Sequence, residues 1–134
     1  MIVTDQARIE DWVRARKCDA DLTDWAGVAT EDAQGVIRCA VIFNHPTYRN
    51  INGHIVSDGS RRWASREFIW AMFHYPFIQL GLNRITAPIA SSNLEARRFV
   101  ERLGFTFEGA LREFYPNGDS QIGYGLLRKD CRYV

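Results

Sequence analysis

The residue types best suited to chemistry gather at one predicted strand-to-helix junction, over residues 54–65. The Asp-Gly-Ser sequence at 58–60 predicts a turn, and a helix that begins there would point N–H groups outward. These N–H groups and the helix dipole favour an anion. Arg61, Arg62 and Arg66 would crowd the first turn and oppose the dipole, so a bound polyphosphate would explain their presence. The alternative is a solvated, capped helix start whose arginines pair with nearby acids.

A second junction lies at residues 90–93, where Ala-Ser-Ser-Asn precedes a helical pattern. Asn93 is expected there as an N-cap, because its side chain can accept a hydrogen bond from an N–H of the first turn. This capping role explains the residue by itself. Periodicity alone therefore assigns no function to this junction.

Helices and strands must position these junctions. Apolar residues at three- and four-residue steps predict helices over residues 4–16, from about 60 to 81, and 94–103. Pro76 predicts a kink or an end late in the second helix. Runs of β-prone residues predict strands over residues 25–30, 36–43, 50–57, 84–90, 105–114 and 121–127. This order predicts an α/β (α+β) fold in which a single mixed β-sheet carries helices on both faces.

Composition and charge limit the classes of protein. The chain has 134 residues, 46% of them hydrophobic, which predicts one domain over residues 1–134. The formal net charge of +1 argues against a nucleic-acid partner. Because we find neither a signal peptide nor an apolar run of about 18 residues, we expect no membrane partner and a soluble, cytoplasmic protein. Three scattered cysteines, with His45 and His74, lack the spacing of metal ligands, so no metal site is predicted.

A family resemblance adds what spacing cannot. Residues 93–109, with Leu-Arg at 111–112, resemble the C-terminal motif of the GNAT N-acetyltransferase superfamily: an Asn, an Ala after two further residues, Leu-Gly-Phe, Glu-Gly and an Arg. Tyr-Pro-Phe at 75–77 and Leu-Gly-Leu-Asn-Arg-Ile at 80–85 are similar to the ribosomal-protein N-acetyltransferase branch. The resemblance extends over about residues 50–127. The chain as a whole also resembles short, phage-type acetyltransferase-like proteins.

The resemblance implies a GNAT-like acyl-CoA N-acyltransferase fold with acetyl-CoA as co-substrate. The strand over 51–57 would splay from the strand over 84–90, and pantetheine would lie between them and pair with the main chain at Ile55 and Val56. Asn93 would face the coenzyme arm. The loop that would cradle the coenzyme pyrophosphate comprises Ser60, Arg61, Arg62, Trp63, Ala64 and Ser65.

If the chain is an enzyme, the implied reaction is direct acyl transfer from a thioester to an amine, which must be neutral to attack. His54 is the candidate base, because imidazole titrates near neutral pH; the alternative is a hydrogen-bonded structural His. Tyr124 is the candidate acid for the leaving thiolate, with a packed tyrosine of the sheet as the alternative. The N–H of Val56 is the candidate donor to the carbonyl oxygen.

Three positions depart from the family pattern. Trp63 occupies the place of the central Gly in the phosphate loop, and Val100 and Ala96 stand where the usual Tyr or Ser acid would be. The sequence is therefore compatible with two functions. One is an N-acetyltransferase that acts on an amine of a peptide or small molecule. The other is a non-catalytic GNAT-like protein that binds a partner or a coenzyme. Exposed sheet edges would favour a homodimer.

Overall fold

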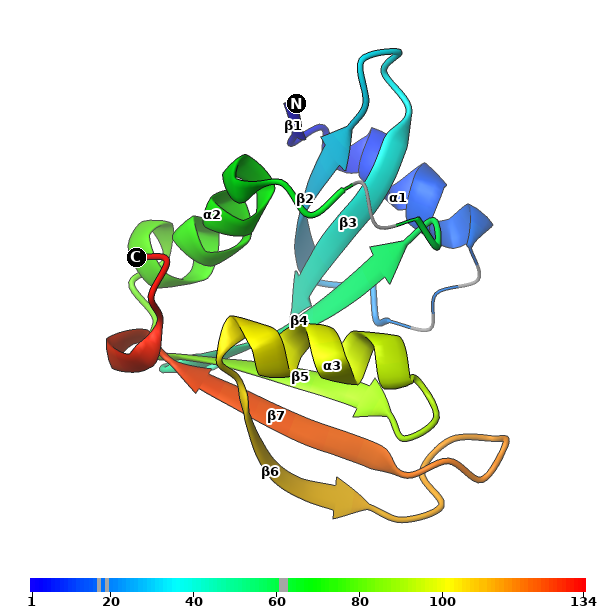
Figure 1. Cartoon of the computed structure of the whole chain (residues 1–134), viewed down its shortest axis with the longest axis vertical. Helices are drawn as coiled ribbons and strands as arrows, with labels where there is room; N and C mark the ends of the chain where they lie inside the picture. The colour runs from blue at the N-terminus through cyan, green and yellow to red at the C-terminus, as the bar shows by residue number, and fades with distance from the viewer. Residues whose placement is uncertain (17, 19, 61–62) are drawn as a thin grey trace.

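The computed structural model describes residues 1–16, 18, 20–60 and 63–134. In this part of the chain seven strands form one mixed sheet in the order β1-β2-β3-β4-β5-β7-β6, which confirms the predicted fold class (Figure 1). The elements are β1 (Ile2–Val3), α1 (Gln6–Ala15), β2 (Trp25–Glu31), β3 (Ile37–Asn44), β4 (Asn50–Ser57), α2 (Arg66–His74), η1 (Tyr75–Gln79), β5 (Arg84–Ala90), α3 (Leu94–Leu103), β6 (Thr106–Leu111), β7 (Gln121–Leu127) and η2 (Arg128–Asp130).

Helices cover both faces of the sheet. α1 lies behind β2 and β3 in Figure 1, and its Ile9 and Val13 pack on Ala40 and Ile42 of β3. α2 and α3 lie on the opposite face, over a larger core that contains Phe43 and the other inward-facing residues of the sheet. The alternation of side chains along each strand divides its residues between these two cores. β2 and β3 therefore have one face toward α1 and the opposite face toward the larger core.

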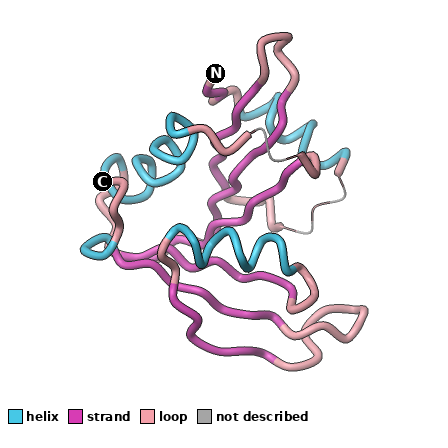
Figure 2. The backbone as a smooth tube through the Cα atoms, viewed as in Figure 1, coloured by secondary structure: helices cyan, strands magenta, loops and turns pink. Residues whose placement is uncertain are grey.

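The centre of the sheet is split. β4 pairs with β5 in parallel only at Asn50↔Arg84, Ile51↔Ile85 and Asn52↔Thr86. β4 continues to Ser57 in register with β3, while β5 continues to Ala90 in register with β7. Figure 2 shows the two strands diverging from their shared start. The right-handed twist of each half carries the strand ends apart.

The second helix begins later than the sequence predicts. α2 starts at Arg66 instead of near residue 60, because Ser65 is its N-cap and its Oγ accepts a hydrogen bond from the N–H of Phe68 at 3.1 Å. The indole of Trp63 packs edge-on against Phe68 and against Phe99 of α3, at centroid distances of 6.1 and 4.9 Å. This contact holds residues 63–65 outside the helix.

The α-helix ends near Pro76 as predicted, but the chain continues as a π-helical turn. α2 ends at His74 and continues as the π-helical turn η1, in which the N–H of Leu80 donates to the carbonyl of Tyr75 at 3.0 Å. A proline has no N–H to continue the α-helical ladder, so the chain changes its hydrogen-bond spacing there. Gly81, at φ +66°, then turns the chain toward β5.

Candidate active site

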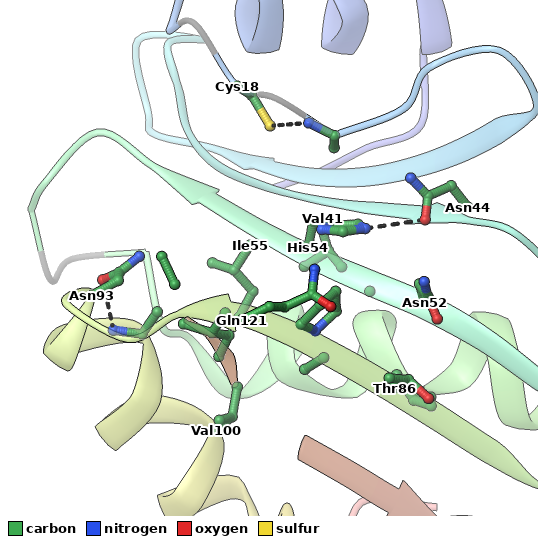
Figure 3. A pocket seen from close by; sticks show the side chains of 18 of the residues that line it. Cys18, Val41, Asn44, Asn52, His54, Ile55, Thr86, Asn93, Val100 and Gln121 are labelled. Atoms are coloured by element: carbon green, nitrogen blue, oxygen red, sulfur yellow. Dashed lines mark hydrogen bonds between the residues drawn. The ribbon is translucent and has the colours of Figure 1, made fainter. Parts of the chain in front are cut away.

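The split between β4 and β5 opens into a cavity of about 830 Å³ (Figure 3). Its walls come from elements far apart in the sequence. They include His54 and Ile55 of β4, Ile89 of β5, Val100 of α3 and Gln121 of β7. Figure 3 shows the side chains of His54, Ile55, Val100 and Gln121 around the gap between the two strands. A cleft at a break in a sheet is a common place for a ligand.

Successive residues of β4 direct their main-chain N–H and carbonyl groups alternately toward β3 and toward the split. The N–H of Asp58 donates to the carbonyl of Arg38 at 3.0 Å, so this pair exchanges hydrogen bonds across β3 and β4. Hydrogen-bonded and non-bonded pairs alternate along an antiparallel ladder, and Val56 and Ala40 are therefore also a hydrogen-bonded pair. Ile55 consequently directs its N–H and carbonyl away from β3, toward the split.

This geometry corrects the role predicted for the main chain of Val56. Its N–H and carbonyl belong to the ladder with β3, so they do not face the split, whereas those of Ile55 do. The same alternation explains why the carbonyl of Arg49 accepts from the N–H of Arg84 at 3.0 Å, where the strands still touch. Beyond Thr86, β5 no longer pairs with β4, and Ile55 lies past that point.

A polar surface lines the α1 side of the cavity. Asn52 and His54 of β4 lie on this side with Thr86 of β5, because residues two apart share a strand face. His54 Nε2 lies 3.0 Å from Asn44 Oδ1, and the hydroxyl of Thr86 donates to Asn50 Oδ1 at 2.6 Å. These hydrogen bonds hold the side chains in fixed orientations.

An acidic residue stands at the rim on the same side. Asp21, in the loop between α1 and β2, lines the cavity, and its carboxylate lies 2.8 Å from His45 Nε2. The hydrogen bond with His45, helped by the hydroxyl and N–H of Thr23, lowers the pKa of Asp21 to about 2. Asp21 is therefore an anion at neutral pH. A cation entering from this side would meet a negative charge.

The other side of the cavity is apolar. Val41, Ile55, Ala87 and Val100 line it, and they belong to the core beneath α2 and α3. Asn93 lies at the end of this wall as the N-cap of α3, and its Oδ1 accepts from the N–H of Ala96 at 3.2 Å. The predicted capping role of Asn93 is therefore present, and the residue also lines the cavity.

The predicted phosphate loop is described in part. Arg61 and Arg62 lie outside the described residues. The N–H and hydroxyl of Ser60 both donate to Asp58 Oδ1, and the N–H of Ser65 donates to the carbonyl of Trp63 at 2.8 Å. Two of the predicted main-chain donors are thus used within the loop.

Other features of this loop remain suited to an anion. Gly59, at φ +90°, makes the turn that leads into it. The first turn of α2 still presents N–H groups at Arg66 and Glu67, next to Ala64. Trp63 packs against α3 and is not among the residues that line the cavity.

The structure does not bring Tyr124 to the cavity. Its side chain is fully buried beneath α3, where the hydroxyl donates to Glu101 Oε2 at 2.7 Å and accepts from Arg97 Nε at 3.3 Å. It belongs to the set of β7 residues that face α3, and it is not among the described residues that line the cavity. This placement favours the alternative of a packed tyrosine.

Comparison with known proteins decides the family. A model of the acetyltransferase (GNAT) domain matches residues 34–123, from before β3 to the middle of β7. The chain belongs to the GNAT acetyltransferase family. The matched region of this GNAT domain contains the whole β4–β5 split and α3.

Relatives of this GNAT chain agree with the assignment. It is 30% identical over 90 residues to an uncharacterized N-acetyltransferase, YoaA, of Bacillus subtilis (strain 168). That match covers 66% of this chain and 51% of the relative, so the chain spans about half the length of the curated relative that it matches.

Solved structures share the fold. The spermidine N-acetyltransferase of Vibrio cholerae in complex with CoA and spermine is 24% identical, with a TM-score of 0.68, and the match covers 92% of this chain and 76% of that one. A dodecameric structure of the same enzyme in an intermediate state has a TM-score of 0.69 at 24% identity, covering 92% and 74%.

Sequence reasoning missed several residues of the GNAT cavity. The sequence patterns assign no role to Asn44, Asn52, Thr86 or Gln121, which line the cavity. A signal for part of this set was present, since Asn50, Asn52 and His54 alternate along one strand and must share a face. The contributions of β3, β5 and β7 needed the folded sheet, because they join that face only through pairing between strands.

None of the helices in the described part of the chain has the length and apolar character needed to span a bilayer. The described residues also contain no group of three or more His, Cys, Asp or Glu side chains that could hold a metal ion.

Proposed function

We propose that this chain transfers an acetyl group from acetyl-CoA to an amine. The observation that carries the proposal is the split between β4 and β5, with the main chain of Ile55 directed into it. A polar wall that contains His54 lies on one side of this split and an apolar wall on the other. The GNAT family assignment supports the same chemistry.

The split fits the pantetheine arm of the coenzyme. The arm contains amide groups in a row, which can pair with main-chain groups of an unpaired strand edge as an added strand does. We expect the N–H and carbonyl of Ile55 to supply this pairing. Asn93 and the apolar wall around Val100 would flank the arm.

The pyrophosphate fits the start of α2. The helix dipole and the N–H groups of Arg66 and Glu67 favour an anion there, beside Ser60 and Ala64. Arg61 and Arg62 are proposed to add positive charge, as their position in the sequence predicts.

The acetyl transfer would proceed by direct attack. The neutral amine nitrogen forms a bond to the thioester carbon as the carbon–sulfur bond breaks, and His54 accepts the proton that the nitrogen loses. The coenzyme leaves as a thiolate, which takes a proton from solvent; an ordinary thiol has a pKa of about 8.5, so it leaves readily. The N–H of Ile55 is the proposed donor to the carbonyl oxygen.

The acceptor is proposed to be a cationic amine. Asp21 places a negative charge at the rim on the side where His54 lies, and this charge would attract an ammonium group before its deprotonation. A polyamine has further ammonium groups that could remain beside Asp21 while one nitrogen reacts. One structure with the same fold is a spermidine N-acetyltransferase in complex with CoA and spermine, which makes polyamines a rational first set of acceptors.

Calorimetric titration with CoA and acetyl-CoA tests the first half of the proposal. We expect binding of both, and no heat with either ligand would overturn the transferase. Thiol release with acetyl-CoA and a panel of polyamines, peptide N-termini and lysine peptides tests the second half. Binding without thiol release for any amine would support the rival function, a GNAT-like protein that holds a coenzyme or partner without turnover.

Substitution of His54 tests the base. His54→Ala should lower kcat by about 10²-fold or more while acetyl-CoA still binds, because a positioned general base contributes about that much. His74→Ala, an exposed residue of α2, is the matched control and should leave the rate unchanged. An unchanged rate in His54→Ala would remove His54 as the base.

Three expectations from the sequence remain predictions. They are the similarity to the ribosomal-protein N-acetyltransferase branch, the similarity to short phage-type proteins, and the formation of a homodimer. The dodecameric assembly belongs to the Vibrio cholerae enzyme, and its fold relation to this chain supports no particular number of subunits here.

A further inference from the structure

We propose that Asn44 is a positioning residue that holds His54 in the tautomer with the proton on Nε2. This inference deepens the proposed function, because it rests on His54 as the base. Asn44 is the last residue of β3, and only 1% of its surface is exposed. A buried carboxamide must satisfy its hydrogen-bonding groups inside the protein, so its orientation is strongly constrained.

The α1–β2 loop determines which way the Asn44 carboxamide points. Its Nδ2 donates to the main-chain carbonyl of Asp21 at 3.0 Å. A carbonyl oxygen can only accept a hydrogen bond. If the carboxamide were flipped, two oxygens would face each other at hydrogen-bond distance inside the protein. The oxygen of Asn44 is therefore the atom that faces β4.

The orientation of Asn44 determines the protonation of His54. Asn44 Oδ1 lies 3.0 Å from His54 Nε2, and a carboxamide oxygen only accepts. His54 Nε2 must therefore carry a hydrogen. A neutral imidazole carries one hydrogen on its two nitrogens, which leaves the lone pair on Nδ1. The Asp21 carbonyl thus orients the Asn44 carboxamide, and Asn44 in turn places a proton on His54 Nε2.

The sheet register makes this contact possible. His54 is paired with Ile42 across β3 and β4, and Asn44 lies two residues farther along β3 on the same face. Diagonal neighbours of this kind are within reach of long polar side chains. Neither residue can move from this face without a shift of the whole register, which would also place Val41 and Ile42 on the wrong faces.

Asn44 would also stabilise the protonated form of His54. When His54 gains a proton, the Nε2–H to Oδ1 hydrogen bond becomes charge-assisted and stronger, so the contact favours the imidazolium that forms during the reaction. The other titratable groups that line the cavity, in the described residues, are Cys18, Asp21, His45, Tyr115 and Asp119.

Nuclear magnetic resonance of the full chain tests the tautomer directly. Long-range nitrogen–proton correlation of the His54 imidazole should show the proton on Nε2 at a pH where the ring is neutral. A proton on Nδ1 in the unaltered protein would overturn the inference. This readout needs no substrate, so it remains decisive even if no amine is acetylated and the proposed function itself fails.

Two substitutions then separate positioning from a merely structural role. Asn44→Leu removes the acceptor at nearly constant volume and should give a mixture of His54 tautomers, with kcat lower by about tenfold, a part of the ~10²-fold contribution of a general base. Asn44→Asp keeps an oxygen acceptor for His54 and should retain the Nε2–H tautomer, with lower stability because its second oxygen would face the Asp21 carbonyl. Asn52→Leu, on the same face but without a hydrogen bond to His54 in the structure, is the control and should leave the tautomer unchanged.

The pH dependence of kcat/KM provides the second readout. The rate should rise as His54 loses its proton. Asn44→Leu removes the acceptor that stabilises the charged ring, so it should lower the pKa of His54 and move this rise to lower pH. Asn44→Asp adds a negative charge beside the ring, so it should raise the pKa of His54 and move the rise to higher pH. Shifts in the same direction, or no shift in a folded Asn44→Leu protein, would overturn the inference. If Asn44→Leu does not fold, the Asn44→Asp shift and the tautomer of the unaltered protein decide the question.

Discussion

At the scale of single residues, the hydroxyl of Tyr124 shows how much a side chain's role depends on the face it occupies. Tyr124 and Gln121 lie on the same strand, three residues apart, and therefore on opposite faces of β7. Gln121 lines the cavity, while Tyr124 packs beneath α3 and hydrogen-bonds to Glu101. The type of a residue suggests chemistry, but the face decides whether that chemistry can reach a substrate.

Tyr124→Phe tests this placement. The change removes the hydrogen bond to Glu101 and should lower the free energy of unfolding by about 1 kcal/mol, because a net intramolecular hydrogen bond contributes about 0.5–1.5 kcal/mol. Urea denaturation measures this loss, and thiol release should show an unchanged kcat. A large loss of kcat with unchanged stability would instead restore Tyr124 as the acid.

At the scale of elements, α1 approaches the sheet closely at Gly27 of β2. Gln6 accepts a hydrogen bond from the N–H of Gly27 at 2.7 Å and donates to its carbonyl at 3.0 Å. β1 pairs with β2 only at Thr30 and Ala29, so the Gln6 carboxamide continues the ladder where β1 has ended. The absence of a side chain at Gly27 lets Ile9 of α1 pack directly on the strand.

Gly27→Ala tests this close approach. An added Cβ would lie 2.8 Å from Trp25 Cζ3 and 3.1 Å from Ile9 Cγ2, so the helix or the indole must move. Overpacking of this kind lowers stability by about 1–3 kcal/mol. Gly123→Ala is the matched control, because its Cβ would meet only the carbonyl of Gly109 at an ordinary 3.8 Å. Thermal denaturation of both variants measures the difference, and equal stabilities would show that α1 does not pack this closely.

At the scale of the whole molecule, the protein consists of two half-sheets joined at three residue pairs. β1 to β4 form one half with α1, and β5, β7 and β6 form the other with α3. The site exists because these halves separate. Its polar wall and its apolar wall each take residues from both halves, so each half alone would lack part of the site.

Amide hydrogen exchange tests whether the split is open in solution. Ile55 and Val56 are neighbours, but only the N–H of Val56 belongs to the ladder with β3. The Ile55 amide should therefore exchange more than about tenfold faster than that of Val56 in the ligand-free protein, and CoA should slow Ile55 alone. Equal protection without ligand would mean that the strands close over the split.

Local signals made the sequence informative about the elements. The N-cap at Asn93, the helix over 94–103 and the strands over 50–57, 84–90 and 121–127 depend on residues close together in the chain, and the structure has them at the predicted bounds. The GNAT resemblance was also present in the sequence. The sequence did not predict the start of α2. Ser65 is the N-cap of this helix, and the nearby Trp63 packs against Phe99 of α3, which is far away in the chain.

The sequence by itself thus determined the order of α1 to α3 and β2 to β7, the N-cap of α3 and the family resemblance, since each depends on patterns close together in the chain. Only the tertiary structure decided which atoms meet at the split. The direction of the Ile55 N–H depends on pairing with β3, and the burial of Tyr124 depends on α3. The contact of His54 with Asn44 joins residues ten apart through the register of two strands. Such contacts depend on long-range pairing, which local preferences do not specify.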